Sequence, residues 1–279
     1  MANSSALDTV VNNVQEEFGG ALSFGSVADL YDAARPDYPE QLIDAVLDYA
    51  ALPQAATALE IGAGTGQATA QFAWRGLAIH AIEPSTKMVS LMAEKFALTG
   101  LSVSLDASTL ESAVLPSSGY DLVFCATAWH WLAPRRRWEI VADVLRPGGT
   151  IAVIYHLPLW RETPLRPALD EIYDTAGAPL AQMGPLLAAR PTLRALANEW
   201  LTDAPDPARF QDERAMEMSW GVTLTGEEYV ELLGTYGDHI GLQSDVRERL
   251  FDGIVDLVRS SGGTIDLAYQ TFLLLARHR

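Results

Sequence analysis

The chain has little cysteine, little lysine and no long run of apolar residues. Cys125 is the one cysteine among 279 residues, so an intrachain disulfide is excluded and nothing indicates an oxidising compartment. No group of cysteines and histidines has the spacing of a zinc site, and we expect no metal. The longest apolar segments fall short of the roughly 20 residues that a membrane-spanning helix needs, so we expect no membrane partner.

Basic residues are also scarce, because 19 lysines and arginines face 36 acidic residues and leave a net charge of −17. A surface with this field repels phosphate backbones, so we expect no nucleic-acid partner. The segment Met1–Phe24 lacks a basic start followed by an apolar stretch, so we expect no signal peptide and a cytoplasmic location. A monomer and a homodimer both stay open.

What the sequence does have is an alternation of short apolar strands with amphipathic helices between residues 57 and 156. Such alternation is typical of a parallel sheet with crossover helices. We expect strands at Ala58–Ile61, Leu77–Ile82, Leu101–Leu105, Asp121–Ala126 and Thr150–Tyr155, and helices at Gln67–Trp74 and about Trp138–Leu145. These strands are almost entirely apolar, which predicts a sheet covered on both faces.

Prolines interrupt residues 157 to 212, where we expect a helical insertion. Two further strands are expected afterwards, at Ala215–Trp220 and Ile265–Leu275, with helices at Gly226–Gly234 and Asp245–Arg259 between them. The predicted fold class is α/β, with a Rossmann-like, seven-stranded, mostly parallel sheet, helices on both faces and the insertion after the fifth strand. Residues 1–56 are expected to form an N-terminal helical cap segment, and residues 57–279 the core.

A glycine-rich turn follows the first expected strand, in the sequence Leu-Glu-Ile-Gly-Ala-Gly-Thr-Gly-Gln of residues 59–67. Glycines let the backbone turn sharply and let a ligand approach the main chain, and the helix that follows offers free N–H groups. Glu83 stands at the end of the next strand, 19 residues after Gly64 (83 − 64). A carboxylate there can accept both hydroxyls of a ribose, so the spacing predicts a nucleoside site.

Two residues distinguish between possible nucleosides. A dinucleotide-binding turn has its third glycine at the position where this chain has Gln67. Glu60, just before the turn, would repel a pyrophosphate but suits a cofactor that carries an ammonium group. Both residues disfavour an NAD(P)-dependent oxidoreductase of Rossmann type, which remains the alternative.

These motifs together resemble the class I S-adenosylmethionine-dependent methyltransferases with a type 11 domain. Within that family the chain is most similar to the small-molecule branch that includes trans-aconitate and ubiquinone-pathway enzymes. The resemblance spans about a hundred residues and rests on Glu60–Gly66, Ile82–Ser85, Asp106-Ala107, Asp121–Phe124, His130-Trp131 and Leu145–Gly149.

The resemblance implies S-adenosyl-L-methionine as cofactor and gives roles to residues around the turn. Glu60 is expected near the methionine ammonium, directly or through water. The backbone of Gly62, Gly64 and Gly66 is expected to line the methionyl and ribose parts. Glu83 is expected to hold the ribose diol.

Four more positions carry a role by the same resemblance. Asp106 is expected to accept a hydrogen bond from the adenine amino group, and the Ala107 N–H to donate to the ring. Ala126 is expected to present backbone near the methionyl chain. Arg35 is expected either to meet the methionine carboxylate or to form a surface salt bridge.

The implied function is methyl transfer to a small-molecule acceptor by in-line displacement, most readily to a carboxylate or hydroxyl oxygen. A base is needed only when the acceptor is protonated, and His130 is the candidate, with His156 second. His130 could instead only shape the pocket. A carboxylate is already a nucleophile at neutral pH, and arginines could hold it.

Other chemistry stays open or is disfavoured. Methylation of carbon is compatible with the same motifs, as is a non-catalytic protein that only binds S-adenosylmethionine. Amino-base methyltransferases have an acidic residue or Asn, two prolines and an aromatic residue after the fourth strand, whereas this chain has Ala-Thr-Ala-Trp-His-Trp at residues 126–131. Methylation of a nucleic-acid base is therefore not expected.

Overall fold

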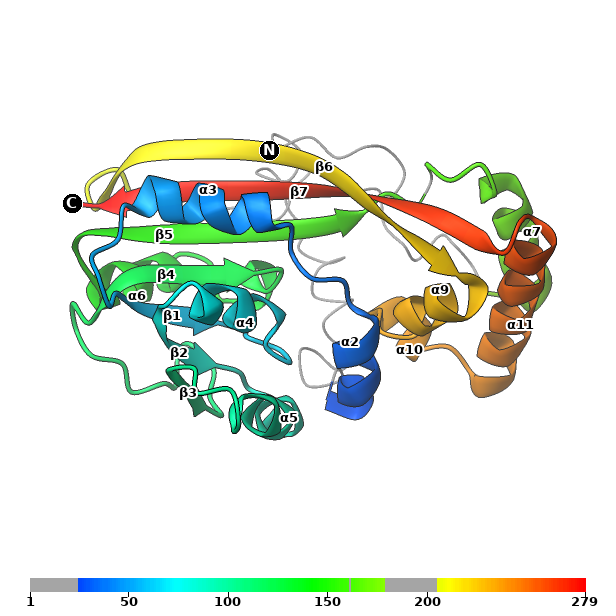
Figure 1. Cartoon of the computed structure of the whole chain (residues 1–279), viewed down its shortest axis with the longest axis horizontal. Coiled ribbons are helices and arrows are strands. Elements are labelled where there is room, and N and C mark those ends of the chain that lie inside the picture. The colour runs from blue at the N-terminus through cyan, green and yellow to red at the C-terminus, as the bar shows by residue number, and fades with distance from the viewer. Residues whose placement is uncertain (1–24, 161, 179–204) are drawn as a thin grey trace, which may run out of the picture. The chain divides into compact units, whose positions relative to one another are not determined.

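The computed structural model describes residues 25–160, 162–178 and 205–279 and contains a seven-stranded sheet (Figure 1). The strand order is β3-β2-β1-β4-β5-β7-β6. Strands β1 to β5 pair in parallel, and β7 is antiparallel to β5. The bounds are β1 Thr57–Ile61, β2 Ala78–Ile82, β3 Val103–Asp106, β4 Tyr120–Ala126, β5 Leu145–Pro158, β6 Phe210–Thr225 and β7 Thr264–His278. The predicted fold class is confirmed.

Helices stand between the strands largely where the apolar periodicity predicts them. They are α2 Ala28–Ala34, α3 Glu40–Ala50, α4 Gln67–Trp74, α5 Thr86–Phe96, α6 Arg136–Val144, α7 Arg166–Ala176, α9 Gly226–Leu233, α10 Gly237–Ile240 and α11 Ser244–Ser260, with a 3₁₀ turn, η2, at Trp129–Trp131. Across the described ranges, no helix is both long and apolar enough to cross a membrane.

The last strands are longer than the sequence predicts. β6 starts at Phe210 rather than at the predicted Ala215. The prediction missed these residues because the first half of the strand is mostly polar and exposed and carries no apolar pattern. β5 extends beyond Tyr155 to Pro158. Strands thus occupy both ends of the expected insertion of residues 157–212. Within it α7 is helical, while residues 161 and 179–204 lie outside the described ranges.

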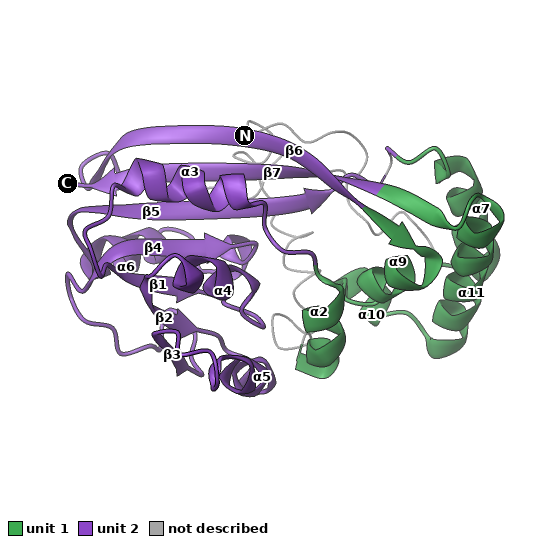
Figure 2. Cartoon of the chain, viewed as in Figure 1, with its two compact units in different colours: residues 1–35, 163–184, 223–266 green, residues 36–162, 185–222, 267–279 purple. Residues whose placement is uncertain are grey.

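The chain divides into two compact units (Figure 2). Unit 1 comprises residues 1–35, 163–184 and 223–266, and unit 2 comprises residues 36–162, 185–222 and 267–279. Of the segment expected as an N-terminal cap, α2 belongs to unit 1 and α3 to unit 2.

Unit 2 has an apolar core on each face of the sheet, because neighbouring strand residues point to opposite faces. Leu122 and Phe124 of β4 join the cluster under α3, α4 and α5, whereas Val123 and Cys125 join the cluster under α6. The helices that follow the strands therefore cover both faces, as predicted.

Unit 1 packs α7, α9 and α11 around buried leucines and isoleucines, among them Leu169, Leu232 and Ile254. A buried polar chain joins α7 to α10. The hydroxyl of Tyr173 lies 2.7 Å from Nε2 of His239, whose Nδ1 lies 2.8 Å from a carboxylate oxygen of Asp238.

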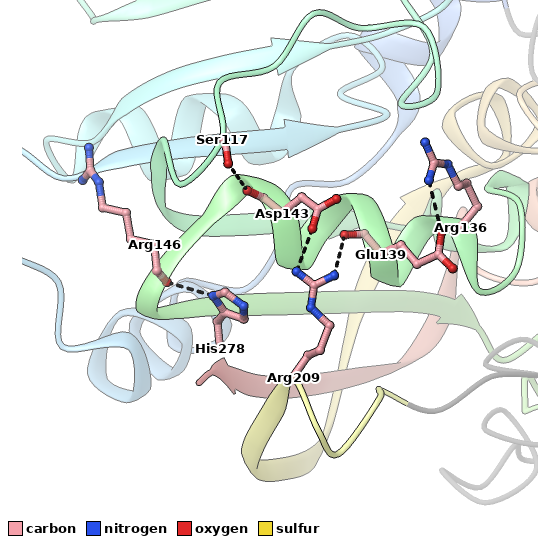
Figure 3. Close-up of polar contacts among 7 residues, drawn as sticks. All are labelled: Ser117, Arg136, Glu139, Asp143, Arg146, Arg209 and His278. Carbon is pink, nitrogen blue, oxygen red and sulfur yellow. Dashed lines mark hydrogen bonds and ion pairs between the residues drawn. The ribbon is translucent and has the colours of Figure 1, made fainter.

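Polar contacts join the start of β6 to α6 and the end of β7 to the start of β5 (Figure 3). Arg209, just before β6, pairs with Asp143 at 2.7 Å. Nδ1 of His278, at the end of β7, lies 3.3 Å from the carbonyl oxygen of Arg146.

Asp121 links three segments at the start of β4. Its Oδ2 accepts from the backbone N–H of Thr57 at 2.9 Å, from the Thr57 hydroxyl at 3.2 Å and from Arg146 at 2.6 Å. Burial opposes ionisation of this carboxyl, but the hydrogen bonds from Thr57 and the Arg146 charge hold its pKa below the ordinary value.

We predict that Asp121→Ala lowers the free energy of unfolding by about 1–3 kcal/mol at pH 7, because the part-buried Thr57 donors lose a charged acceptor. Asp143→Ala is the control, since it breaks the exposed Arg209 pair and should cost less than about 1 kcal/mol. Urea unfolding of both variants measures the difference. Equal losses would contradict the role given to Asp121.

Candidate functional site

The glycine turn after β1 uses backbone that only glycine adopts readily. Gly62, Gly64 and Gly66 have φ of 70°, 60° and 89°. A Cβ on Gly62 would lie 2.5 Å from the Cβ of Ala128, so the turn packs directly against the segment after β4. Gly66 also caps α4, which begins at Gln67.

Glu83, the expected ribose acceptor, lies against this turn. One carboxylate oxygen accepts from the N–H of Gly64 at 3.0 Å, and the other from the N–H of Ser85 at 2.9 Å. The side chain is buried, and burial raises its pKa against these two bonds. Each carboxylate oxygen retains acceptor capacity for a further donor.

Glu60 lies in β1 beneath the turn and is 1% exposed. The hydroxyl of Thr69, on α4, donates to its carboxyl group. Burial raises the pKa of Glu60 to about 8 against this hydrogen bond, and the nearby Glu83 raises it too. Glu60 is therefore mostly protonated at neutral pH, and a cation brought beside it would favour its ionised form.

Asp106 and Ala107 lie at the end of β3, beside the end of β2. The N–H of Glu83 donates to the carbonyl oxygen of Asp106 at 3.1 Å, and Asp106 pairs with Ile82 in the sheet. Asp106 is half-buried and Ala107 exposed. The carboxyl edge of the parallel strands thus brings Glu60, Glu83 and Asp106 into one region, while their contacts with a cofactor stay predictions.

Ala126 ends β4 and is followed by Thr127, whose φ is 58°. The N–H of Thr127 donates to the carbonyl oxygen of Ile154 at 2.7 Å, and its hydroxyl lies 3.0 Å from the Tyr38 hydroxyl. This fixed turn carries Ala128 to its contact with Gly62.

His130 lies in η2, with its ring centroid 6.0 Å from that of Tyr155. Burial lowers the pKa of His130 to about 4, and the positive charge of Arg137 acts in the same direction. His130 is therefore neutral at pH 7, which is the form that a base requires, although a group with so low a pKa is a weak base.

Arg35 lies in unit 1, at the end of α2. Its Nε donates to the hydroxyl of Thr235 at 2.8 Å and its Nη2 to the Thr235 carbonyl oxygen at 3.0 Å. The guanidinium lies 3.7 Å from the ring centroid of Tyr236. Its contact with a cofactor carboxylate stays a prediction.

Sequence reasoning missed the residues that hold the site together. Thr69 is nine positions from Glu60, and Thr127 carries no motif of its own. A hydroxyl that donates to a carboxyl group on another element leaves no periodic pattern in the sequence. Thr69 could have been found only by packing α4 against β1.

Residues 58–149 match the family model described as a methyltransferase domain. An uncharacterized methyltransferase of Mycobacterium tuberculosis (strain ATCC 25618 / H37Rv) is 31% identical over 238 residues, which cover 85% of this chain and 86% of the relative. The chain belongs to the methyltransferase family. It is a class I S-adenosylmethionine-dependent methyltransferase, with the strand order and glycine turn described above.

Solved structures show the same fold at low identity. A protein from Anaeromyxobacter dehalogenans gives a TM-score of 0.59 at 20% identity and covers 87% of this methyltransferase and 97% of its own chain. The [4+2]-cyclase SpnF gives 0.52 at 17% identity, with coverages of 92% and 96%. Identities this low establish the fold alone.

We predict that Gly62→Ala weakens binding of S-adenosylhomocysteine by more than tenfold, because its Cβ would meet Ala128. Gly100→Ala is the matched control: Gly100 has the same φ of 70° but no neighbour within 4 Å of an added Cβ. Both variants should lose about 1–2 kcal/mol of stability through left-handed strain. Isothermal titration and urea unfolding separate the two effects, and an equal loss of affinity in both variants would contradict the packing argument.

We also predict that S-adenosylhomocysteine binding at pH 7 releases most of one proton. Glu60 has a pKa of about 8 in the free protein, so it enters the complex protonated, and the ligand's ammonium should lower that pKa. Affinity should therefore rise as the pH increases from 6 to 7.5. Titration in buffers of different ionisation enthalpy counts the protons. Glu60→Gln should release none, and a wild-type affinity independent of pH would refute the assignment.

Proposed function

We propose that this methyltransferase transfers the methyl group of S-adenosylmethionine to an oxygen atom of a small molecule, a carboxylate or a hydroxyl, by in-line displacement. One observation carries the donor part of the proposal. The left-handed glycine turn lies between two buried carboxyl groups, Glu60 and Glu83, which have raised pKa values.

The residues at this edge fit the chemistry of the donor. Glu60 would face the ammonium group of the donor, because a positive charge beside this buried carboxyl group would favour its ionised form. Glu83 would accept from the ribose hydroxyls, and Asp106 with the Ala107 N–H would meet the adenine. The glycine turn would allow close approach of the main chain, with Ala126 opposite.

When bound, S-adenosylmethionine supplies a methyl group that its own positive charge activates. The chain then has to align the acceptor and exclude water. A small acceptor is supported by the resemblance to the trans-aconitate and ubiquinone-pathway branch, and a polyanionic one is disfavoured by the net charge of −17. The pyrophosphate of a cofactor such as NAD(P) would instead lie close to Glu60, whose ionised carboxylate would repel it.

The state of His130 favours a carboxylate over a hydroxyl. A carboxylate is ionised at neutral pH and needs no base, whereas a hydroxyl would depend on a histidine whose pKa is only about 4. For a hydroxyl acceptor His130 is the proposed base. For a carboxylate it would only shape the site beside Tyr155.

The first experiment is isothermal titration with S-adenosylhomocysteine, with NAD(H) as the comparison ligand. Glu83→Ala should weaken binding by about tenfold or more, because charge-assisted hydrogen bonds contribute roughly 1.5–3 kcal/mol. Glu94→Ala, an exposed glutamate on α5, should leave the affinity unchanged. Binding of NAD(H) alone would refute the donor assignment.

A second experiment separates a catalyst from a protein that only binds the donor. The fold alone does not decide this, since one structural neighbour is named a cyclase. Labelled S-adenosylmethionine should transfer its methyl group to members of a library of small carboxylates and phenols. Transfer that occurs only to protein or nucleic acid would refute the small-molecule proposal.

A further inference from the structure

Four aromatic side chains from distant parts of the sequence meet on one face of unit 2. They are Tyr38, His156 of β5, Trp220 of β6 and Tyr269 of β7, which together form the aromatic wall. Ring centroids are 4.5 Å apart for His156–Trp220, 4.7 Å for His156–Tyr269, 4.6 Å for Trp220–Tyr269 and 5.0 Å for Tyr38–His156. Tyr269 is buried, and the other three are half-buried.

The aromatic wall continues the sheet face that α3 covers. His156 pairs with Thr271 across β5 and β7, two residues from Ile154 and Leu273, which belong to the core under α3. α3 begins at Glu40, just after Tyr38. The apolar face thus changes from packed aliphatic residues to half-buried aromatic rings where the helix starts.

One buried hydroxyl fixes the edges of two of these rings. The indole N–H of Trp220 donates to Oγ1 of Thr271 at 2.9 Å, and Nδ1 of His156 lies 2.9 Å from the same oxygen. An indole nitrogen can only donate. The Thr271 oxygen therefore accepts from Trp220, and the same hydroxyl holds the edge of the His156 ring.

Trp220 and His156 both stack on Tyr269. The angle between the ring planes is 14° for Trp220 and Tyr269 and 28° for His156 and Tyr269, whereas it is 37° for His156 and Trp220 and 60° for Tyr38 and His156. A stack of rings can be extended by a further flat ring, whereas a quaternary ammonium group is recognised by rings that surround it on several sides. The stacked part of the aromatic wall therefore favours a flat ligand.

The aromatic wall is joined to the glycine turn by a short series of contacts. The Tyr38 hydroxyl bonds to Thr127 at 3.0 Å, and Ala128, the next residue, packs against Gly62. Both contacts lie within unit 2. A ligand on the aromatic wall would therefore lie near the post-β4 segment that packs against the glycine turn.

We propose that the aromatic wall is the acceptor subsite and that the acceptor contains a flat, conjugated ring which stacks on Trp220. This inference rests on the proposed function. Thr271 is a positioning residue, because it touches no ligand and acts through the two rings that it orients.

The test uses the full chain saturated with S-adenosylhomocysteine and three aromatic carboxylates: benzoate, 4-hydroxybenzoate and 2-naphthoate. Each is compared with its ring-saturated counterpart, which carries the same substituents without a flat ring. Ligand-observed NMR titrations measure the affinities. We expect at least one aromatic probe to bind at least tenfold more tightly than its counterpart.

The variants assign that preference to the aromatic wall. Trp220→Ala should abolish it, Trp220→Phe should retain most of it, and Thr271→Val should reduce it without removing it. Trp74→Ala, which removes a 67% exposed tryptophan on α4, should leave it unchanged. An unchanged midpoint of thermal unfolding and an unchanged affinity for S-adenosylhomocysteine in Trp220→Ala show that the fold and the donor site are intact.

Two results would overturn the proposal: equal binding of all flat and saturated partners, or a preference that survives Trp220→Ala. Failure of the wild type to bind S-adenosylhomocysteine would instead refute the donor site. The ring preference would then be measured on the protein without that ligand, so the two failures are distinguishable.

Discussion

The hydrogen bond between the Gly64 N–H and the Glu83 carboxylate is the contact on which the site depends. It joins the turn after β1 to the end of β2, and Glu83 in turn donates its own N–H to the end of β3. Three loops are therefore held in register by one side chain and its backbone. Because this side chain is buried, its pKa is raised, and a cation placed beside it would favour its ionised form.

The second buried carboxyl, Glu60, makes the same edge responsive to charge. A neutral acid is tolerated in the core, whereas a carboxylate held there by the Thr69 hydrogen bond alone would be strongly destabilising. Burial thus favours the protonated form of Glu60 in the free protein. Cys125, on β4, is buried too, and burial raises its pKa, so its thiol takes no comparable role.

The sequence predicts those parts of the fold and the site that leave a local pattern in the chain. The first five strands and their helices have local periodicity, and Glu83 could be placed because strand ends in a parallel sheet share an edge. β6 was underestimated because an exposed edge strand such as residues 211–217 has no apolar alternation to detect. The aromatic wall was not predicted, because Trp220 and Tyr269 become neighbours only through the pairing of strands that are distant in the chain. The roles of Arg35 and His130 toward ligands remain predictions.

The position of β7 has a consequence for how the sheet is built. β6 precedes β7 in the chain, but β7 lies between β5 and β6. β6 therefore has no sheet neighbour until the segment beginning at Thr264 has arrived and paired with β5. During synthesis β6 is therefore made before the strand with which it pairs, and α9, α10 and α11 are made in between. The exposed charges of its first half, including Asp212, Glu213 and Arg214, would discourage pairing with another chain during that interval.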